Sequence, residues 1–179
     1  MNPLVVLMGP PGAGKSTVAR ELGARLGAAV VDTDVCVQDR AGMSISDLFV
    51  EHGEEYFRTL EREVVAEQLA THDGILALGG GSILAPATQE ALAGQAVVFL
   101  DVSLKYAVKR TGLDHGRPLL ALNPRASWLR LMEARRPIYE RLATVTVDTS
   151  GKTPAQIATE IIDALGLARE ETVAETEDH

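Results

Sequence analysis

The octapeptide Gly9-Pro-Pro-Gly-Ala-Gly-Lys15-Ser16 restricts the architecture of this chain more than any other segment. It fits the pattern G-x-x-x-x-G-K-[ST], and it lies between a short apolar run at residues 4–8 and a helix-period stretch that begins near Lys15. Glycines let successive backbone N–H groups curl around a polyphosphate, and the N-terminus of the following helix adds partial positive charge. The alternative, a glycine-rich turn that precedes a lysine by chance, fits this context poorly. The octapeptide therefore predicts a phosphate-binding loop.

The ligands expected on such a loop are a nucleotide and a magnesium ion. Lys15 is expected to reach the β- and γ-phosphates, and Ser16 is expected to be a ligand of Mg²⁺. The predicted nucleotide contacts on this loop are Gly12, Ala13, Gly14, Lys15, Ser16 and Thr17.

Short β-branched apolar runs recur along the chain and predict five buried strands, at residues 4–8, 29–32, 75–78, 97–101 and 145–148. Helix-period stretches separate them, at residues 15–26 with a stop signal at Gly27, and at 54–70, 86–93, 103–110, 126–135 and 154–165. This alternation predicts an α/β fold of three layers, with a five-stranded parallel sheet between two layers of helices. Ligands of such sheets bind at the carboxyl ends of the strands.

Two stretches break the alternation. Residues 33–70 look like an insertion after the second strand, in which Ser44 or Ser46 is expected to cap a short helix at residues 47–50. Residues 112–124 carry glycine and proline at both ends and little periodicity, and they are a candidate mobile lid.

Composition excludes several classes of protein. The 179 residues are predicted to form one domain at 1–167, followed by an acidic and disordered tail at 168–179. The formal net charge of −8 argues against a nucleic-acid surface, and no apolar run approaches the roughly 20 residues that span a membrane. With no secretory signal and a single cysteine, Cys36, we expect a cytoplasmic protein. No exposed apolar repeat suggests an oligomer, so we expect a monomer.

The sign of the charge reverses between Arg110 and Arg141, where seven arginines face three acidic residues. A basic segment inside an acidic protein indicates a local anion site. For any single arginine in this window, the plain alternative is a solvated surface residue.

Two carboxylates, Asp32 and Asp34, end the predicted second strand. On an extended segment residues i and i+2 point the same way, so both are expected to face a site above the sheet edge. One carboxylate near a nucleotide can hold the water shell of its metal, and the other can accept a proton from an attacking hydroxyl. The alternative is a pair that caps the next helix or turn.

Two further groups have both a structural and a functional interpretation. Arg58 and Glu61 are neighbours on one face of a predicted helix and form either a solvated ion pair or part of a site. The run Gly79-Gly80-Gly81 follows the third strand, where close approach to a ligand or a plain turn would explain it. The histidines have no metal-ligand spacing, which leaves no case for zinc, and Cys36 is expected to pack rather than react.

In this order along residues 4–165, these segments resemble the shikimate kinase family, a group of nucleoside-monophosphate-kinase-like P-loop proteins. The matching segments are Gly9 to Ser16, Asp32-Thr-Asp34, Phe57-Arg58-x-x-Glu61, Gly79-Gly-Gly81, Arg110-Thr-Gly, Arg117-Pro-Leu-Leu, and an Arg-x-x-x-Tyr pattern that ends at Tyr139. The resemblance implies ATP-dependent phosphorylation of the 3-hydroxyl of shikimate, a step toward chorismate and the aromatic amino acids.

The resemblance also implies roles for single residues on the substrate side, within a binding region at 33–61 and beyond it. Asp34 would bind the reacting hydroxyl and take its proton. Arg58 and an arginine before Tyr139 would clamp the carboxylate. The family pattern places that arginine four residues before the tyrosine, which selects Arg135 rather than Arg136. The backbone of Gly79, Gly80 and Gly81 would contact the ring hydroxyls.

On the nucleotide side, the resemblance implies that Asp32 holds the water shell of Mg²⁺ and that Arg110 stacks on adenine. Arg117 would close with the lid onto the phosphates and act in catalysis beside Lys15. Lys152 matches a nucleotide-side position.

Two other functions stay open on the sequence. One is a related kinase of a small metabolite, such as a gluconate kinase, and a nucleoside monophosphate kinase fits the residues less well. The other is a catalytically silent nucleotide-binding module, against which the full set of charged motif residues weighs.

Overall fold

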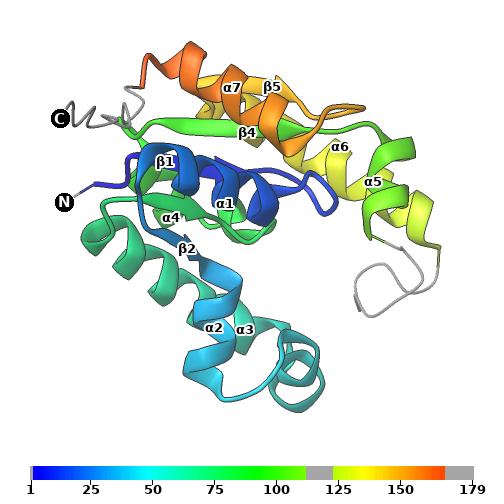
Figure 1. The fold of residues 1–179 in the computed structure, drawn as a ribbon. Coiled ribbons are helices and arrows are strands. Elements are labelled where there is room, and N and C mark those ends of the chain that lie inside the picture. Colours follow the sequence, from blue (N-terminus) through cyan, green and yellow to red (C-terminus); the bar gives the residue numbers. More distant parts are fainter. Residues whose placement is uncertain (1, 112–122, 168–179) are drawn as a thin grey trace, which may run out of the picture.

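The computed structural model describes residues 2–111 and 123–167 (Figure 1). Its elements in chain order are β1 (Val5–Met8), α1 (Lys15–Leu26), β2 (Val30–Asp32), α2 (Thr33–Ala41), α3 (Ile45–Thr71), β3 (Ile75–Ala77), the 3₁₀ turn η1 (Ser82–Leu84), α4 (Pro86–Leu92), β4 (Val97–Asp101), α5 (Leu104–Thr111), α6 (Pro124–Leu142), β5 (Val145–Asp148) and α7 (Pro154–Leu165). The predicted tail and all but the last two residues of the predicted lid lie outside the described residues.

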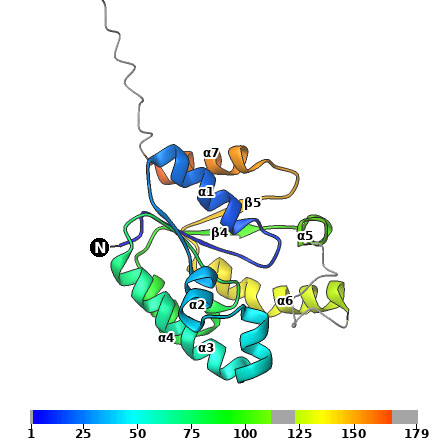
Figure 2. The same ribbon diagram turned by 60° about the horizontal axis from the view of Figure 1, so that its bottom comes forward.

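The strands form one parallel sheet in the order β2-β3-β1-β4-β5, as the alternation predicts. Helices α1 and α7 lie together over one face, and α3, α4 and α6 lie on the other (Figure 2). Because both faces are covered, β1 and most of β4 are completely buried and read as continuous apolar runs. The carboxyl ends of all five strands meet at one edge of the sheet, which is where the predicted site residues follow β1, β2 and β3.

Helix α1 packs closely against the start of β2 because it carries Gly23 on its buried face. A Cβ atom at this position would lie 2.4 Å from Cγ2 of Val30 and 2.8 Å from the carbonyl oxygen of Ala28. The helix ends at Gly27, which has a φ of 60° and donates its N–H to the carbonyl of Gly23. The predicted stop signal is therefore confirmed.

The insertion after β2 folds as a pair of helices with its own small core, built around Val37, Leu48, Phe57 and Val64. Of the two serines considered as caps, Ser44 accepts a hydrogen bond from the N–H of Asp47 at 3.1 Å and caps α3. The prediction of a short helix followed by a longer one is confirmed, because Gly53 has non-helical backbone angles and divides α3 (Ile45–Thr71) into two helical segments. Gly53 has a φ of 83°, which accounts for the break in the pattern.

The expectation that Asp32 and Asp34 share an extended segment is wrong. Helix α2, which the sequence did not predict, begins at Thr33, so Asp34 lies in its first turn. Asp32 is the N-cap of this helix and accepts a hydrogen bond from the N–H of Asp34 at 2.9 Å. The capping alternative describes the backbone correctly, because a carboxylate satisfies the free N–H groups of a helix start.

Helix α6 extends past its predicted end at Arg135 and continues through Pro137 to Leu142. Proline removes one helical hydrogen bond, but the turn that follows is held by burial of Tyr139. The Tyr139 ring stacks on Phe99 of β4, with a distance of 4.9 Å between ring centroids. Tertiary packing therefore outweighs the helix-breaking signal of the proline.

Replacement of Gly23 by alanine tests the close approach of α1 to β2. In an exposed helix this change would stabilise the chain by about 1 kcal/mol through helix propensity. Here we expect a loss of about 1–3 kcal/mol in the free energy of unfolding, measured with urea, because Val30 and the backbone at Ala28 must shift. Arg20→Ala, an exposed change on the same helix, is the control and should stay within about 0.5 kcal/mol. A stabilised Gly23→Ala variant would contradict this packing.

Candidate active site

The phosphate loop between β1 and α1 requires glycine at several positions. Gly12 and Gly14 have φ angles of 86° and 84°, which side chains of other residues rarely allow. A Cβ on Gly9 would lie 2.5 Å from the carbonyl oxygen of Leu100, and one on Gly12 would lie 2.8 Å from Cα of Ala107. The loop is therefore wedged against the end of β4 and against α5, which holds its curled backbone in place.

Two cations bind the carbonyl groups of this loop. The Lys15 ammonium donates to the carbonyls of Gly9 and Pro10, at 2.8 and 3.1 Å. Arg110 donates to the carbonyls of Gly12 and Ala13, at 3.3 and 3.4 Å. These contacts neutralise the carbonyl side of the loop, and its N–H side is left for an anion.

Arg110 also connects the phosphate loop to the end of β5. Its guanidinium donates to the hydroxyl and the carbonyl oxygen of Thr149, at 2.8 and 2.6 Å. The predicted stacking of Arg110 on adenine stays a prediction, and the contacts place the residue at the rim of the phosphate loop.

Ser16 and Asp32 lie together at the start of α1, where the Ser16 hydroxyl donates to the Asp32 carboxylate at 2.6 Å. Both are oxygen donors of the kind that Mg²⁺ prefers, and they fit an ion that keeps waters and also binds phosphates. Over the part of the chain that the structure describes, no group of three or more His, Cys, Asp or Glu side chains forms a metal site made by protein alone. The pair therefore fits a magnesium ion carried by a nucleotide.

A cavity of about 480 Å³ lies at the carboxyl edge of the sheet and brings residues of the predicted nucleotide site together with Asp34 and Gly80. Its walls include Gly12, Gly14, Lys15, Ser16, Thr17, Asp32, Asp34, Gly80 and Arg110. Asp34 comes so close to the glycine run that a Cβ on Gly79 would lie 2.4 Å from its Oδ1 atom. The lack of a side chain at Gly79 is what lets Asp34 reach the cavity.

The glycine run after β3 is held by three side chains. Thr33 accepts a hydrogen bond from the N–H of Gly79 at 2.9 Å, and Ser82 donates to the carbonyl of Gly79 at 2.7 Å. Tyr139 donates to the carbonyl of Gly80 at 2.7 Å. Burial raises the pKa of Tyr139 to about 12, so its hydroxyl remains a donor. Both backbone groups of Gly79 are engaged, whereas at Gly80 and Gly81 the carbonyl oxygens are the groups that accept hydrogen bonds.

Arg58 and Glu61 form a buried ion pair rather than a solvated one. Glu61 is 3% exposed, and its carboxylate accepts from Arg58 at 2.7 Å. Burial raises the pKa of the Glu61 carboxyl, and the positive charge of Arg58 opposes part of that shift. The Arg58 guanidinium lies against Gly81, where a Cβ would come within 2.5 Å of it.

The two adjacent arginines of α6 point to different places. Arg135 is 6% exposed and its Nη1 atom lies 3.2 Å from the position that a Cβ on Gly80 would take. Arg136 forms two hydrogen bonds to the Asp101 carboxylate, at 2.8 and 3.0 Å. Arg135 therefore joins Arg58 beside the glycine run, as the tyrosine spacing suggested, while Arg136 fastens α6 to the end of β4.

Of the predicted residues that the structure describes, Lys152 lies away from this group. Lys152 makes an ion pair with Glu160 of α7 at 2.7 Å, and its nucleotide contact stays a prediction. Arg117 lies outside the described residues. Two side chains that the sequence did not single out hold loops of the site. Thr33 binds the N–H of Gly79, and Trp128 donates to the carbonyl of Pro11 at 2.9 Å. The sequence held two signals for these residues. Thr33 is a small polar residue between two aspartates, and Trp128 is the one tryptophan of the chain, seven residues before Arg135.

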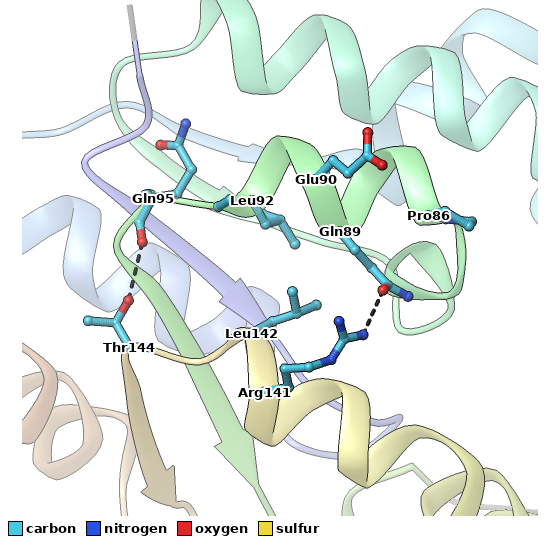
Figure 3. Close-up of a pocket in the computed structure, with 10 residues that line it drawn as sticks. Pro86, Gln89, Glu90, Leu92, Gln95, Arg141, Leu142 and Thr144 are labelled. Atoms are coloured by element: carbon cyan, nitrogen blue, oxygen red, sulfur yellow. Dashed lines mark hydrogen bonds between the residues drawn. The ribbon is translucent and has the colours of Figure 1, made fainter.

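A second cavity, of about 710 Å³, lies between α4 and the C-terminal end of α6 (Figure 3). Its polar contacts are already made within the chain, from Arg141 to Gln89 at 2.7 Å and from Thr144 to the carbonyl of Gln95 at 3.2 Å. None of the predicted site residues lines it. The motif residues line the cavity at the phosphate loop and a further cavity of about 480 Å³ beside Arg58, Glu61 and Gly81.

Comparison with known proteins agrees with the motifs. A family model described as shikimate kinase matches residues 11–166. A shikimate kinase of Thermobifida fusca (strain YX) is 55% identical over 167 residues, which are 93% of this chain and 97% of that protein. A solved shikimate kinase from Acinetobacter baumannii, in complex with shikimate, superposes with a TM-score of 0.86 at 33% identity, covering 91% of this chain and 92% of that one. A gluconokinase from Sinorhizobium meliloti 1021 reaches a TM-score of 0.59 at 22% identity over 90% of each chain, a likeness in fold alone.

The buried Glu61 carboxyl gives a prediction for the pH dependence of stability. Because its pKa is raised above the ordinary value of 4.5, the folded chain keeps this proton to higher pH than the unfolded chain. That contribution to stability is fully present below the unfolded pKa and is lost as the pH rises through the folded pKa. As the pH rises above about 4.5, the free energy of unfolding of the wild type should therefore fall relative to Glu61→Gln, which does not titrate.

Urea unfolding of both proteins at stepped pH measures this difference directly. If the wild type instead gains stability over Glu61→Gln as the pH rises, the charge of Arg58 lowers the pKa of Glu61 by more than burial raises it.

Proposed function

The chain belongs to the shikimate kinase family, and from this premise we propose that it transfers the γ-phosphate of ATP to the 3-hydroxyl of shikimate, giving 3-phosphoshikimate and ADP. The single observation that carries the proposal is one cavity whose wall joins the phosphate loop to Asp34, beside the buried Arg135 and the half-buried Arg58. This geometry suits a phosphate donor at one end and a small hydroxylated carboxylic acid at the other. The reaction belongs to the biosynthesis of the aromatic amino acids.

On the acceptor side, Asp34 is the residue for the reacting hydroxyl. Its carboxylate lies in the first turn of α2, against Gly79, and faces the same cavity as Lys15. A carboxylate held there accepts a hydrogen bond from the hydroxyl, orients its oxygen toward the phosphorus and takes the proton as the bond to phosphorus forms.

The carboxylate of the substrate is bound by two arginines, of which Arg135 is buried and Arg58 is half-buried. Arg58 is held by Glu61, and Arg135 by its place between Gly80 and Tyr139. A guanidinium offers paired donors that match a carboxylate, and low solvent access strengthens the interaction. The N–H groups of Gly80 and Gly81 lie next to both arginines and suit the ring hydroxyls.

On the donor side, the backbone of residues 12–17 and the Lys15 ammonium hold the phosphates. Ser16 and Asp32 would hold Mg²⁺, which when bound with ATP neutralises the charge that develops on the phosphates. Arg110 would lie beside the base, Lys152 on the nucleotide side, and Arg117 would close onto the transferred group. The chain would act as a cytoplasmic monomer with no nucleic-acid or membrane partner. No helix within the described ranges is both long and apolar enough to span a membrane.

An assay of ADP release with shikimate, gluconate and AMP as parallel acceptors separates the alternatives. We expect turnover with shikimate alone. Release of ADP only with gluconate would favour the related metabolite kinase, and ATP binding without turnover on any acceptor would favour the silent module.

Replacement of Asp34 by asparagine tests the role of its carboxylate. We expect kcat to fall by about 10²–10⁴, because the proton acceptor is lost while the shape of the side chain is kept. Asp39→Asn, an exposed change of the same kind on α2, is the control and should keep wild-type kcat. A kcat for Asp34→Asn within a factor of three of wild type would remove Asp34 from the mechanism.

The adjacent arginines of α6 offer a matched pair of variants. Arg135→Met should raise the KM for shikimate by about ten- to a hundredfold and leave the KM for ATP near the wild-type value, because a carboxylate partner is lost. Arg136→Met should keep the KM for shikimate and lower the free energy of unfolding by about 1 kcal/mol, since it breaks the partly exposed pair with Asp101. The reverse pattern of KM values would reassign the clamp to Arg136.

A further inference from the structure

Helix α6 presents a line of buried side chains to the active-site edge of the sheet: Trp128, Met132, Arg135 and Tyr139. Arg135 belongs to the proposed carboxylate clamp, and Tyr139 holds the carbonyl of Gly80. Trp128 stands at the other end of the line, about 16 Å along the helix from Tyr139 at 1.5 Å per residue. The proposed function gives it no role.

Trp128 makes one specific polar contact. It is 3% exposed, and its indole N–H donates to the carbonyl oxygen of Pro11 at 2.9 Å. Pro11 lies inside the phosphate loop and lines the same cavity as Lys15. A buried carbonyl that lost this donor would be left without its partner, so the contact constrains the loop as well as the helix.

The carbonyl of Pro11 and the N–H of Gly12 belong to one peptide group. A trans peptide is planar, with its C=O and N–H pointing in opposite directions. A donor that fixes the Pro11 carbonyl toward α6 therefore turns the Gly12 N–H away from α6. Across residues 2–111 and 123–167, no hydrogen bond of the chain uses that N–H.

The neighbouring peptide bonds do not fix this orientation by themselves. Gly12 has a φ of 86° and no side chain, so its backbone has more freedom than that of any other residue type. The Pro10 carbonyl is bound by Lys15 and by the N–H of Ala13, while the Pro11 carbonyl is bound by Trp128. The donor that binds the Pro11 carbonyl of the loop is thus a side chain of α6.

We propose that Trp128 is a positioning residue for nucleotide binding: its indole N–H fixes the Pro11–Gly12 peptide so that the Gly12 N–H is presented to the phosphates. Trp128 acts through the loop and does not touch the substrate. Because the helix that carries it also carries Arg135, the same rigid element sets the phosphate loop and the carboxylate clamp relative to each other. This proposal rests on the proposed function only where it names shikimate as the acceptor. The role of Trp128 in nucleotide binding does not depend on which acceptor is used.

The sharpest test removes the N–H and keeps the shape. Incorporation of 3-benzothienylalanine at position 128 replaces the indole N–H by sulfur and leaves a bicyclic ring of nearly the same size. Trp128→Phe is the encoded variant that also lacks the donor. ADP binding is measured by calorimetry without any acceptor, and KM values for ATP and shikimate are measured with wild-type protein alongside.

We expect both variants to weaken ADP binding and to raise the KM for ATP about three- to tenfold, as the loss of one hydrogen bond predicts, with the KM for shikimate within twofold of wild type. Met132→Ala is the packing control. Met132 is 4% exposed on the same face of α6 and donates no hydrogen bond, so this variant should lose stability but keep its affinity for ADP.

Affinity for ADP within twofold of wild type in the benzothienyl variant would overturn the proposal, and so would an equal loss of affinity for ADP in Met132→Ala. Since ADP binding is measured without an acceptor, a failure of the shikimate assay would leave this result interpretable. Weak ADP binding in the benzothienyl variant alone would support the positioning role whatever the acceptor.

Discussion

The constraint on which the structure depends is the close approach of three backbone segments at the carboxyl edge of the sheet. Gly9 lies against the backbone at the end of β4, where a Cβ atom does not fit, and Gly79 and Gly81 lie so close to the side chains of Asp34 and Arg58 that a Cβ atom would displace them. The parallel sheet brings these segments together because β1, β2 and β3 are neighbours and end at the same edge. Absence of side chains at these points lets charged groups from α1, α2 and α3 converge on one small volume.

Buried charge is the second consequence of this arrangement. Glu61, Arg58 and Arg135 lie together with little access to water, and the raised pKa of Glu61 reflects the cost of its burial. Arg58 is paired with Glu61 and with the exposed Glu54, whereas Arg135 lies beside Gly80 and Tyr139, where a carboxylate of the substrate would be its partner. An anionic substrate would then bind to groups that the fold has already oriented, which reduces the entropy lost on binding.

Much of this could be predicted from the sequence, because strong local signals and topology agreed. Five short apolar runs and the octapeptide at Gly9 predicted the parallel sheet and the phosphate loop correctly. The conformation around Asp34 was not predictable in the same way, because α2 depends on the cap supplied by Asp32 and on packing of Val37 against α3. The end of α6 was misjudged at Pro137, where stacking of Tyr139 on Phe99 decides the conformation. The contact of Trp128 with Pro11 joins residues 117 positions apart, and no local pattern reports such a pair.

The most direct measurement of the central claim is a crystal structure with ADP and shikimate bound together. The 3-hydroxyl should lie within hydrogen-bond distance of the Asp34 carboxylate, about 2.6–3.2 Å, and should be directed at the phosphate loop. Arg58 and Arg135 should both contact the shikimate carboxylate while Arg136 remains on Asp101. A bound shikimate whose 3-hydroxyl lies beyond reach of Asp34, or whose carboxylate is held by Arg136, would contradict the account.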